Sequence, residues 1–255
     1  MARKRKPEAA EQEMPSSSSS QVDESSSAGP QEPATEKGQQ MRAHYLACAQ
    51  SALNDASLDY GSLYQRYVVD PQGVQGLDQM VARVALRAGS HARQVIQVLA
   101  QGPFTQAQTQ GLSADEKKAK IPGLLKYAQE TVDVVQQQRY VEYANAALGT
   151  VQAYPDLYRE HVGTDLTAIQ LDQRVVAAAL QGGESADAIA SLLQQGPYAR
   201  FQRDVKQMDA GGIEQYARGA IAQVQTIQSL RLGQVNQPGQ STDQAMSSPN
   251  REMEL

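Results

Sequence analysis

The chain of 255 residues contains 23 Lys and Arg against 28 Asp and Glu, 11 Tyr, no Trp and one cysteine. Between residues 42 and 231 the count is 17 basic to 18 acidic residues, and this near neutrality argues against a large basic face. No apolar run approaches the roughly 20 residues that span a bilayer, no secretory signal is present, and Cys48 permits no internal disulfide, so we expect a cytoplasmic protein.

Both ends of the chain are polar. Residues 1–40 begin with the basic cluster Arg3-Lys4-Arg5-Lys6 and continue with serine, proline and glutamate, and residues 233–255 have a similar composition. Such segments bury too little apolar surface to offset their ordering entropy, and we predict that both are disordered. The basic cluster is either a nuclear import signal or a charged chain start, and the sequence does not distinguish the two.

The sequence between these tails contains the same apolar and turn signals twice. Leu77-Asp78-Gln79 returns as Leu171-Asp172-Gln173, and Gln101-Gly102-Pro103 returns as Gln195-Gly196-Pro197, each 94 positions later. We therefore predict a tandem duplication, with a first repeat at residues 41–139 and a second at residues 140–232.

Helix-forming residues dominate both repeats, and no segment alternates with a period of two. The fold class is therefore predicted to be all-α. In the first repeat we expect helices over residues 40–53, 58–69, 74–88 and 91–101. Gly89 is expected to end the third helix in a left-handed conformation and Ser90 to cap the fourth.

The region that joins the repeats lacks a helix breaker. Ser113 and Glu116 have the spacing of a capping box, and Pro122 suits the first turn of the next helix. Nothing between Pro122 and Leu148 interrupts a helix, so the two repeats are expected to share one long helix. In the second repeat we expect a helix that starts at Pro155 and further helices over residues 166–181, 186–195 and 213–227.

Chemical motifs are scarce. His44, His91 and His161 are isolated from one another, whereas a metal site needs three or four convergent ligands. Cys48 has the surroundings of a buried residue, and Gly102-Pro103 and Gly196-Pro197 are predicted helix stops, not phosphate loops. We therefore expect no enzyme activity, no metal, no cofactor and no small-molecule substrate.

The eleven tyrosines are the main aromatic resource. Their recurrence in both repeats, as in Tyr45 with Tyr140 and Tyr127 with Tyr216, favours helix packing with the hydroxyl groups turned to water. Stacking on nucleic-acid bases is the alternative.

The helix pair around each repeated glycine fits a helix–turn–helix. That motif has a small residue four positions before a turn glycine and apolar residues six and nine positions after it. These positions hold Ala85, Gly89, Val95 and Val98 in the first repeat, and Ala179, Gly183, Ile189 and Leu192 in the second. The residue after the glycine, usually apolar, is Ser90 or Glu184, and the carboxylate of Glu184 is expected to repel phosphate. An ordinary pair of antiparallel helices with a capped turn is the alternative.

Candidate nucleic-acid contacts follow from this motif and from the charge that comes after each Gly-Pro. They are Arg83, Arg87, His91, Arg93, Gln94 and Gln97 near the first turn, Lys117, Lys118 and Lys120 later in the first repeat, and Arg200, Arg203 and Lys206 in the second. The basic residues after each Gly-Pro have two explanations. They form a shared surface that follows a phosphate backbone, or they are ordinary solvated charges on short helices.

The order apolar helix, glycine turn, apolar helix and proline resembles a small helical module of plasmid-borne relaxase and primase proteins, particularly cyanobacterial ones. The resemblance covers Ala82 to Pro103 and Ala177 to Pro197. It implies an accessory role in plasmid replication or mobilisation, because the catalytic motifs of these enzymes are not recognisable. We therefore expect a nucleic-acid-associated accessory protein or, as the alternative, a protein-interaction or self-association scaffold; no membrane role is expected.

Overall fold

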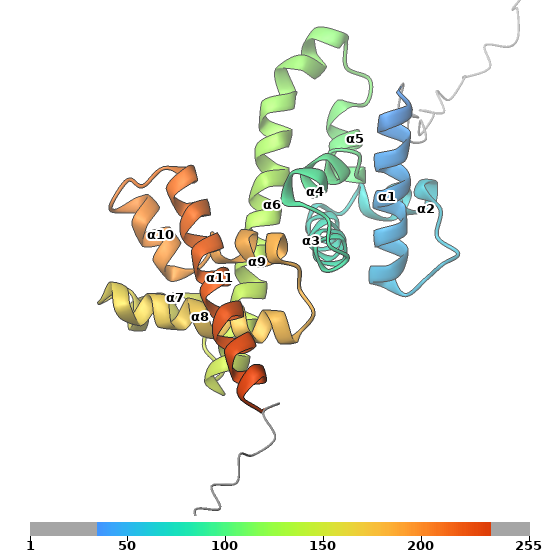
Figure 1. The fold of residues 1–255 in the computed structure, drawn as a ribbon. Coiled ribbons are helices and arrows are strands. Elements are labelled where there is room, and N and C mark those ends of the chain that lie inside the picture. The colour runs from blue at the N-terminus through green and yellow to red at the C-terminus, as the bar shows by residue number, and fades with distance from the viewer. Residues whose placement is uncertain (1–34, 236–255) are drawn as a thin grey trace, which may run out of the picture.

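The computed structural model describes residues 35–235, which form eleven α-helices and no strand, and this confirms the predicted all-α fold class (Figure 1). The helices are α1 (Glu36–Leu53), α2 (Tyr60–Tyr67), α3 (Pro71–Arg87), α4 (Ala92–Leu99), α5 (Pro103–Thr109), α6 (Ala114–Leu148), α7 (Tyr154–His161), α8 (Asp165–Gln181), α9 (Ala186–Leu193), α10 (Pro197–Asp204) and α11 (Ala210–Val235). No helix of the described part is long and apolar enough to cross a bilayer.

The ends of the described region correct the predicted tails. Helix α1 starts at Glu36, where the Thr35 hydroxyl accepts a 3.1 Å hydrogen bond from the Gly38 amide. Helix α11 runs to Val235. Residues 36–40 and 233–235 are therefore helical, with Thr35 as the N-cap of α1, and residues 1–34 and 236–255 of the predicted tails lie outside the described residues.

Helix α6 is the shared helix expected from the sequence, but it begins earlier than Pro122. Ser113 and Glu116 form the predicted capping box, and the helix starts directly after it. Pro122 is therefore an interior residue, and its placement in a first turn was wrong. A helix interior tolerates proline poorly because the ring removes one backbone donor, yet the exposed position of Pro122 leaves the freed carbonyl open to water.

The turn between α3 and α4 has the predicted geometry with one difference. Gly89 adopts φ 87°, as the prediction of a left-handed cap requires. The N-cap of α4 is His91, without a side-chain cap, and not Ser90. In the second turn Gly183 has φ 81°, and the Ser185 hydroxyl caps α9 by accepting from the Ala188 amide at 3.2 Å.

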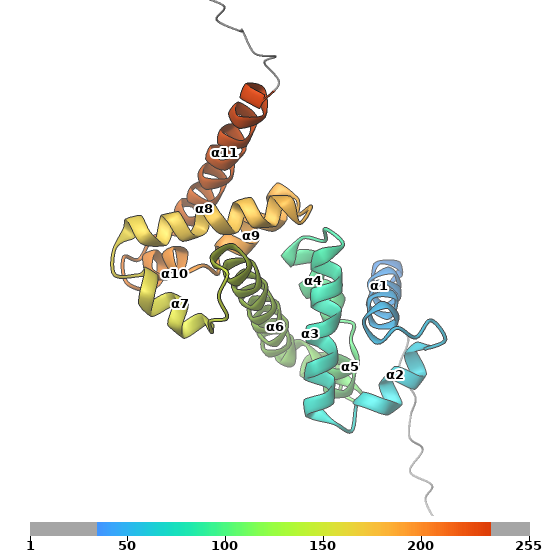
Figure 2. The same ribbon diagram turned by 90° about the horizontal axis from the view of Figure 1, so that it is seen from below.

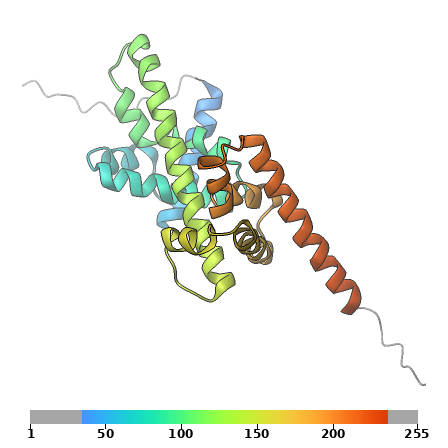
Figure 3. The same ribbon diagram turned by 90° about the vertical axis from the view of Figure 1, so that its left-hand side faces the viewer.

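Helix α6 lies at the centre of the molecule and contacts helices on both sides. It packs against α3 and α4 of one part of the molecule and against α8 and α9 of the other. One hydrophobic cluster includes α6 residues up to Val135, and a second begins at Tyr140. We call the part around the first cluster the N-terminal half and the part around the second the C-terminal half; the end of α11 projects away from both (Figures 2 and 3).

Candidate interaction site

A buried carboxylate joins three helices of the N-terminal half. The Tyr45 hydroxyl of α1 donates a 2.7 Å hydrogen bond to one oxygen of Asp78 in α3, and the Tyr127 hydroxyl of α6 donates a 2.8 Å bond to the other. Asp78 has no exposed surface. The prediction that these tyrosine hydroxyls turn to water was therefore wrong, because the packed helices bring an acceptor to them.

The same arrangement occurs in the C-terminal half. The hydroxyls of Tyr140 and Tyr216 donate to the two oxygens of Asp172 at 2.6 and 2.7 Å. Beside each arrangement an aromatic ring lies 4.2 Å from a tyrosine ring, Phe104 on Tyr127 and Tyr198 on Tyr216. We call the two sets the Tyr–Asp–Tyr triads. Such matched contacts agree with a duplication, although the superposition of the two halves stays a prediction.

The repeated Gly-Pro pairs lie against these triads. Gly102 and Gly196 precede α5 and α10 as N-caps, followed by proline at the first helical position. A Cβ atom on Gly102 would lie 2.7 Å from the ring of Tyr45, and one on Gly196 would lie 2.7 Å from the ring of Tyr140. The glycine is therefore required by close packing, in addition to its predicted role at a helix stop.

Burial changes the acid–base behaviour of both aspartates. Desolvation raises the pKa of Asp78 to about 6 and that of Asp172 to about 7, although the tyrosine hydrogen bonds oppose the change. Both carboxylates are enclosed by the core, and neither lines a described pocket. We therefore assign the triads a role in holding the helices together.

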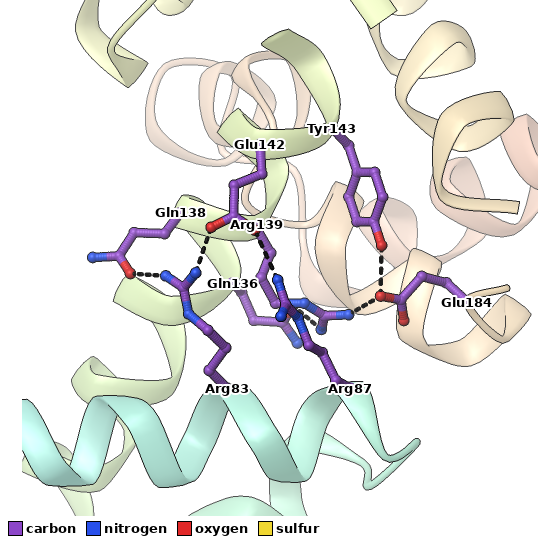
Figure 4. A network of polar contacts seen from close by, with 8 residues as sticks. All are labelled: Arg83, Arg87, Gln136, Gln138, Arg139, Glu142, Tyr143 and Glu184. Carbon is purple, nitrogen blue, oxygen red and sulfur yellow. Dashed lines mark hydrogen bonds and ion pairs between the residues drawn. The ribbon is translucent and has the colours of Figure 1, made fainter. Parts of the chain in front are cut away.

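Two arginines that the sequence suggested as phosphate ligands form ion pairs within the chain (Figure 4). Arg83 and Arg87 of α3 both pair with Glu142 of α6, Arg87 at 3.3 Å, and Arg83 also donates to Gln138 at 2.6 Å. Glu142 lies in the C-terminal half of α6, so these contacts connect the two halves. The carboxylate of Glu142 also neutralises part of the positive charge of the two arginines, which the sequence had suggested as phosphate ligands.

A second ion pair in the same network is buried. The guanidinium of Arg139, 2% exposed, pairs with Glu184, 10% exposed, and the Tyr143 hydroxyl donates to Glu184 at 2.7 Å. Glu184 was expected to repel phosphate at a surface, but it faces the protein interior instead (Figure 4). The corresponding first-repeat residues are His44 and Ser90, so this pair belongs to the C-terminal half alone.

A polar groove of about 550 Å³ lies between the halves. Helix α4 and its N-cap contribute His91, Arg93 and Ile96, and the opposite wall comes from α9 and α11, with Gln129 of α6 also in the lining. We call it the inter-half groove. The two helices that the sequence marked as reading helices thus line the same groove, with Gln94 and Gln97 of α4 exposed outside it.

The wall opposite α4 carries charges of both signs. Arg218 of α11 pairs with Asp187 of α9 at 3.3 Å and with Glu214 at 3.1 Å. The sequence offered no signal for this cluster, because α9 and α11 meet only in the folded chain.

The remaining basic candidates lie on separate elements. Lys117, Lys118 and Lys120 are on the first turns of α6, where Lys120 donates to the Gln108 carbonyl at 3.1 Å. Arg200 and Arg203 are on α10, the first beside Asp204 at 3.6 Å and the second donating to the Gln194 carbonyl at 2.6 Å. Lys206 follows α10 and lies 5.8 Å from the Phe201 ring. The start of α6 and α10 lie apart in Figures 1 and 2, so one shared basic surface is not formed.

Residues 35–235 contain no group of three His, Cys, Asp or Glu side chains that could hold a metal ion. Sequence reasoning missed Asp78 and Asp172 as organising residues. The signal was present, because both belong to the matched tripeptides. It also missed Glu142 and Arg139, which no local pattern marks.

No family model, curated protein or solved structure matches this chain. The resemblance to relaxase and primase accessory modules therefore stays a prediction.

Proposed function

We propose that the protein is a non-enzymatic interaction scaffold whose inter-half groove binds an extended peptide segment of a partner protein. The observation that supports it best is that α4 and α9, one on each side of the groove, both pack against one continuous helix, α6, which has buried polar contacts in both halves. Fixed walls lower the ordering cost of binding.

The chemistry of the groove suits a polar peptide. Arg93 on the α4 wall forms no ion pair within residues 35–235, and the opposite wall offers the carboxylates of Asp187 and Glu214. Gln129 and Gln194 add amide groups that can bond a peptide backbone. The volume lies in the usual range of ligand sites.

Nucleic acid is the second candidate, and a specific observation favours it. Gln94 and Gln97 are exposed on α4, and Lys117 and Lys118 form no ion pair within the described part of the chain. It ranks second because His91 and Arg93 face α9 and α11, whereas a reading helix must enter a major groove about 12 Å wide without a neighbour in the way. An accessory role in plasmid replication or mobilisation would belong to this second candidate.

A peptide-display selection on the full chain tests the scaffold proposal. Selected peptides are titrated calorimetrically against wild type, against Ser191→Arg inside the groove, and against Gln97→Arg on the exposed side of α4. We expect Ser191→Arg to weaken binding at least about tenfold, since roughly 1.4 kcal/mol lost is a factor of ten, and Gln97→Arg to leave it unchanged. Equal binding by all three proteins, or no selected peptide, refutes the groove as the site.

A mobility-shift titration at two salt concentrations tests the second candidate. Phosphate contacts predict that log affinity falls linearly with log salt and that Lys117→Ala/Lys118→Ala weakens binding. Arg159→Ala, which removes an exposed pair with Asp156, is the matched control. No shift at low salt excludes nucleic acid as the ligand of this surface.

A further inference from the structure

The first turns of α6 carry an uncovered apolar and basic face. Ile121 and Leu125, one helical turn apart, are 48% and 45% exposed. Between residues 117 and 129 the chain has four lysines, Lys117, Lys118, Lys120 and Lys126, and no acidic residue. We call residues 117–126 the α6 apex.

The lysines of the apex differ in their partners. Lys126 lies 3.7 Å from Glu130, and Lys120 contacts Gln108. Lys117 and Lys118 form no ion pair within residues 35–235. Of the two acidic residues just before the apex, Glu116 is occupied by the Ser113 amide and hydroxyl at 2.8 and 2.7 Å, and Asp115 is exposed.

The start of α1 lies at the same level as the apex. Tyr45 of α1 and Tyr127 of α6 bind the same carboxylate, that of Asp78. Glu36 lies nine residues before Tyr45, and Lys118 lies nine residues before Tyr127. Along the helix axis, each is therefore about 13–14 Å from its tyrosine, toward the N-terminus of its helix. Both helices run in the same direction from that end (Figure 1), so the chain enters α1 at the same end of the N-terminal half as the apex.

The sequence that precedes α1 is acidic. Residues 7–34 contain six carboxylates and no Lys or Arg: Glu8, Glu11, Glu13, Asp23, Glu24 and Glu32. Asp23 is twelve residues from Thr35, and an irregular chain of that length has an r.m.s. span of about 20 Å. The acidic residues are thus within reach of the apex by chain length alone.

We propose that residues 7–34 of this chain bind the α6 apex of the same molecule. Their carboxylates pair with Lys117 and Lys118, and Val22 and Met14 cover Ile121 and Leu125. The segment thereby competes with any other anionic partner for this surface, which makes it an internal regulator of access to the apex.

Carbodiimide cross-linking of the full chain, followed by mass spectrometry, tests the proposal, because it joins lysine amines and carboxylates only at direct contact. We expect cross-links from residues 7–34 to Lys117 and Lys118, and none to Lys206, an exposed lysine of the C-terminal half. Equal yields at Lys206 and at the apex overturn the proposal.

Two further arms distinguish the origin of the contact. The variant Asp23→Asn/Glu24→Gln/Glu32→Gln is expected to lower the yield at least about fivefold, and about 1 M salt, where the Debye length is about 3 Å, does the same. In a mixture of isotope-labelled and unlabelled chains the cross-links should stay within one isotope. Mixed-isotope cross-links overturn the proposal in favour of a second copy of the chain.

Discussion

The hydroxyl of Tyr140 donates a 2.6 Å hydrogen bond to Asp172, whose carboxylate is completely buried. Tyr127, less than four turns earlier on α6, donates to Asp78 in the other half of the molecule. One helix thus bonds to a buried carboxylate in each half.

The first prediction concerns pH. Burial raises the folded-state pKa of Asp78 to about 6 and of Asp172 to about 7, above the ordinary value of 3.8. The folded state therefore binds these protons more tightly, so their contribution to stability is fully present below pH 3.8 and is lost as pH rises through 6 and 7. Urea unfolding should give a free energy lower at pH 8 than at pH 5 by on the order of 4 kcal/mol, because about one pH unit for Asp78 and about two for Asp172 contribute roughly 1.4 kcal/mol each.

The isosteric change Asp78→Asn/Asp172→Asn supplies the control for that pH effect. Asparagine cannot ionise, so the variant should lose this dependence between pH 5 and 8. A variant with the same slope as wild type would show that other groups cause it.

The second prediction concerns the tyrosine hydroxyls. Tyr45→Phe keeps the ring but leaves Asp78 with one donor, and should lower the free energy of unfolding by about 1–2 kcal/mol. Tyr158→Phe is the matched control, because the side chain of Tyr158 is partly exposed and its hydroxyl is not bonded to either aspartate. Equal effects of the two changes would contradict a specific role for the triad.

The third prediction concerns close packing at glycine. Gly196→Ala places a methyl group 2.7 Å from the Tyr140 ring and 2.9 Å from Asp172, and should destabilise the protein by about 2 kcal/mol or more. Gly123→Ala, in the open on α6, should stabilise it by about 0.5–1 kcal/mol, since alanine favours helix interiors. Thermal unfolding of both variants measures the difference in sign, and a stabilised Gly196→Ala would refute the packing argument.

The fourth prediction concerns the buried ion pair. Arg139→Met leaves Glu184 without its cation and should cost about 3 kcal/mol. Arg139→Met/Glu184→Gln should recover part of this loss, because no unpaired charge remains. The exposed pair of Arg159 and Asp156 gives the control, since Arg159→Met should leave stability unchanged in the same denaturant titration.

Helix boundaries were predictable where local chemistry decides them. The left-handed Gly89 and the capping box of Ser113 and Glu116 were expected and are present. Pro122 misled the prediction because the N-cap Ser113, nine residues earlier, had already started the helix. The roles of individual charged residues were harder to predict from the sequence. Arg83 and Arg87 had the features of phosphate ligands, and only the folded structure shows that both form ion pairs with Glu142.

From the sequence alone came the helical class, the glycine turns and the continuity of α6, since caps and helix propensity depend on residues a few positions apart. Folding decided the partners of the tyrosines, the pairing of Arg139 with Glu184 and the meeting of α4 and α9 at one groove. These contacts join residues 32 or more positions apart in each case, and a buried polar group accepts whichever partner the packed helices bring within hydrogen-bond distance.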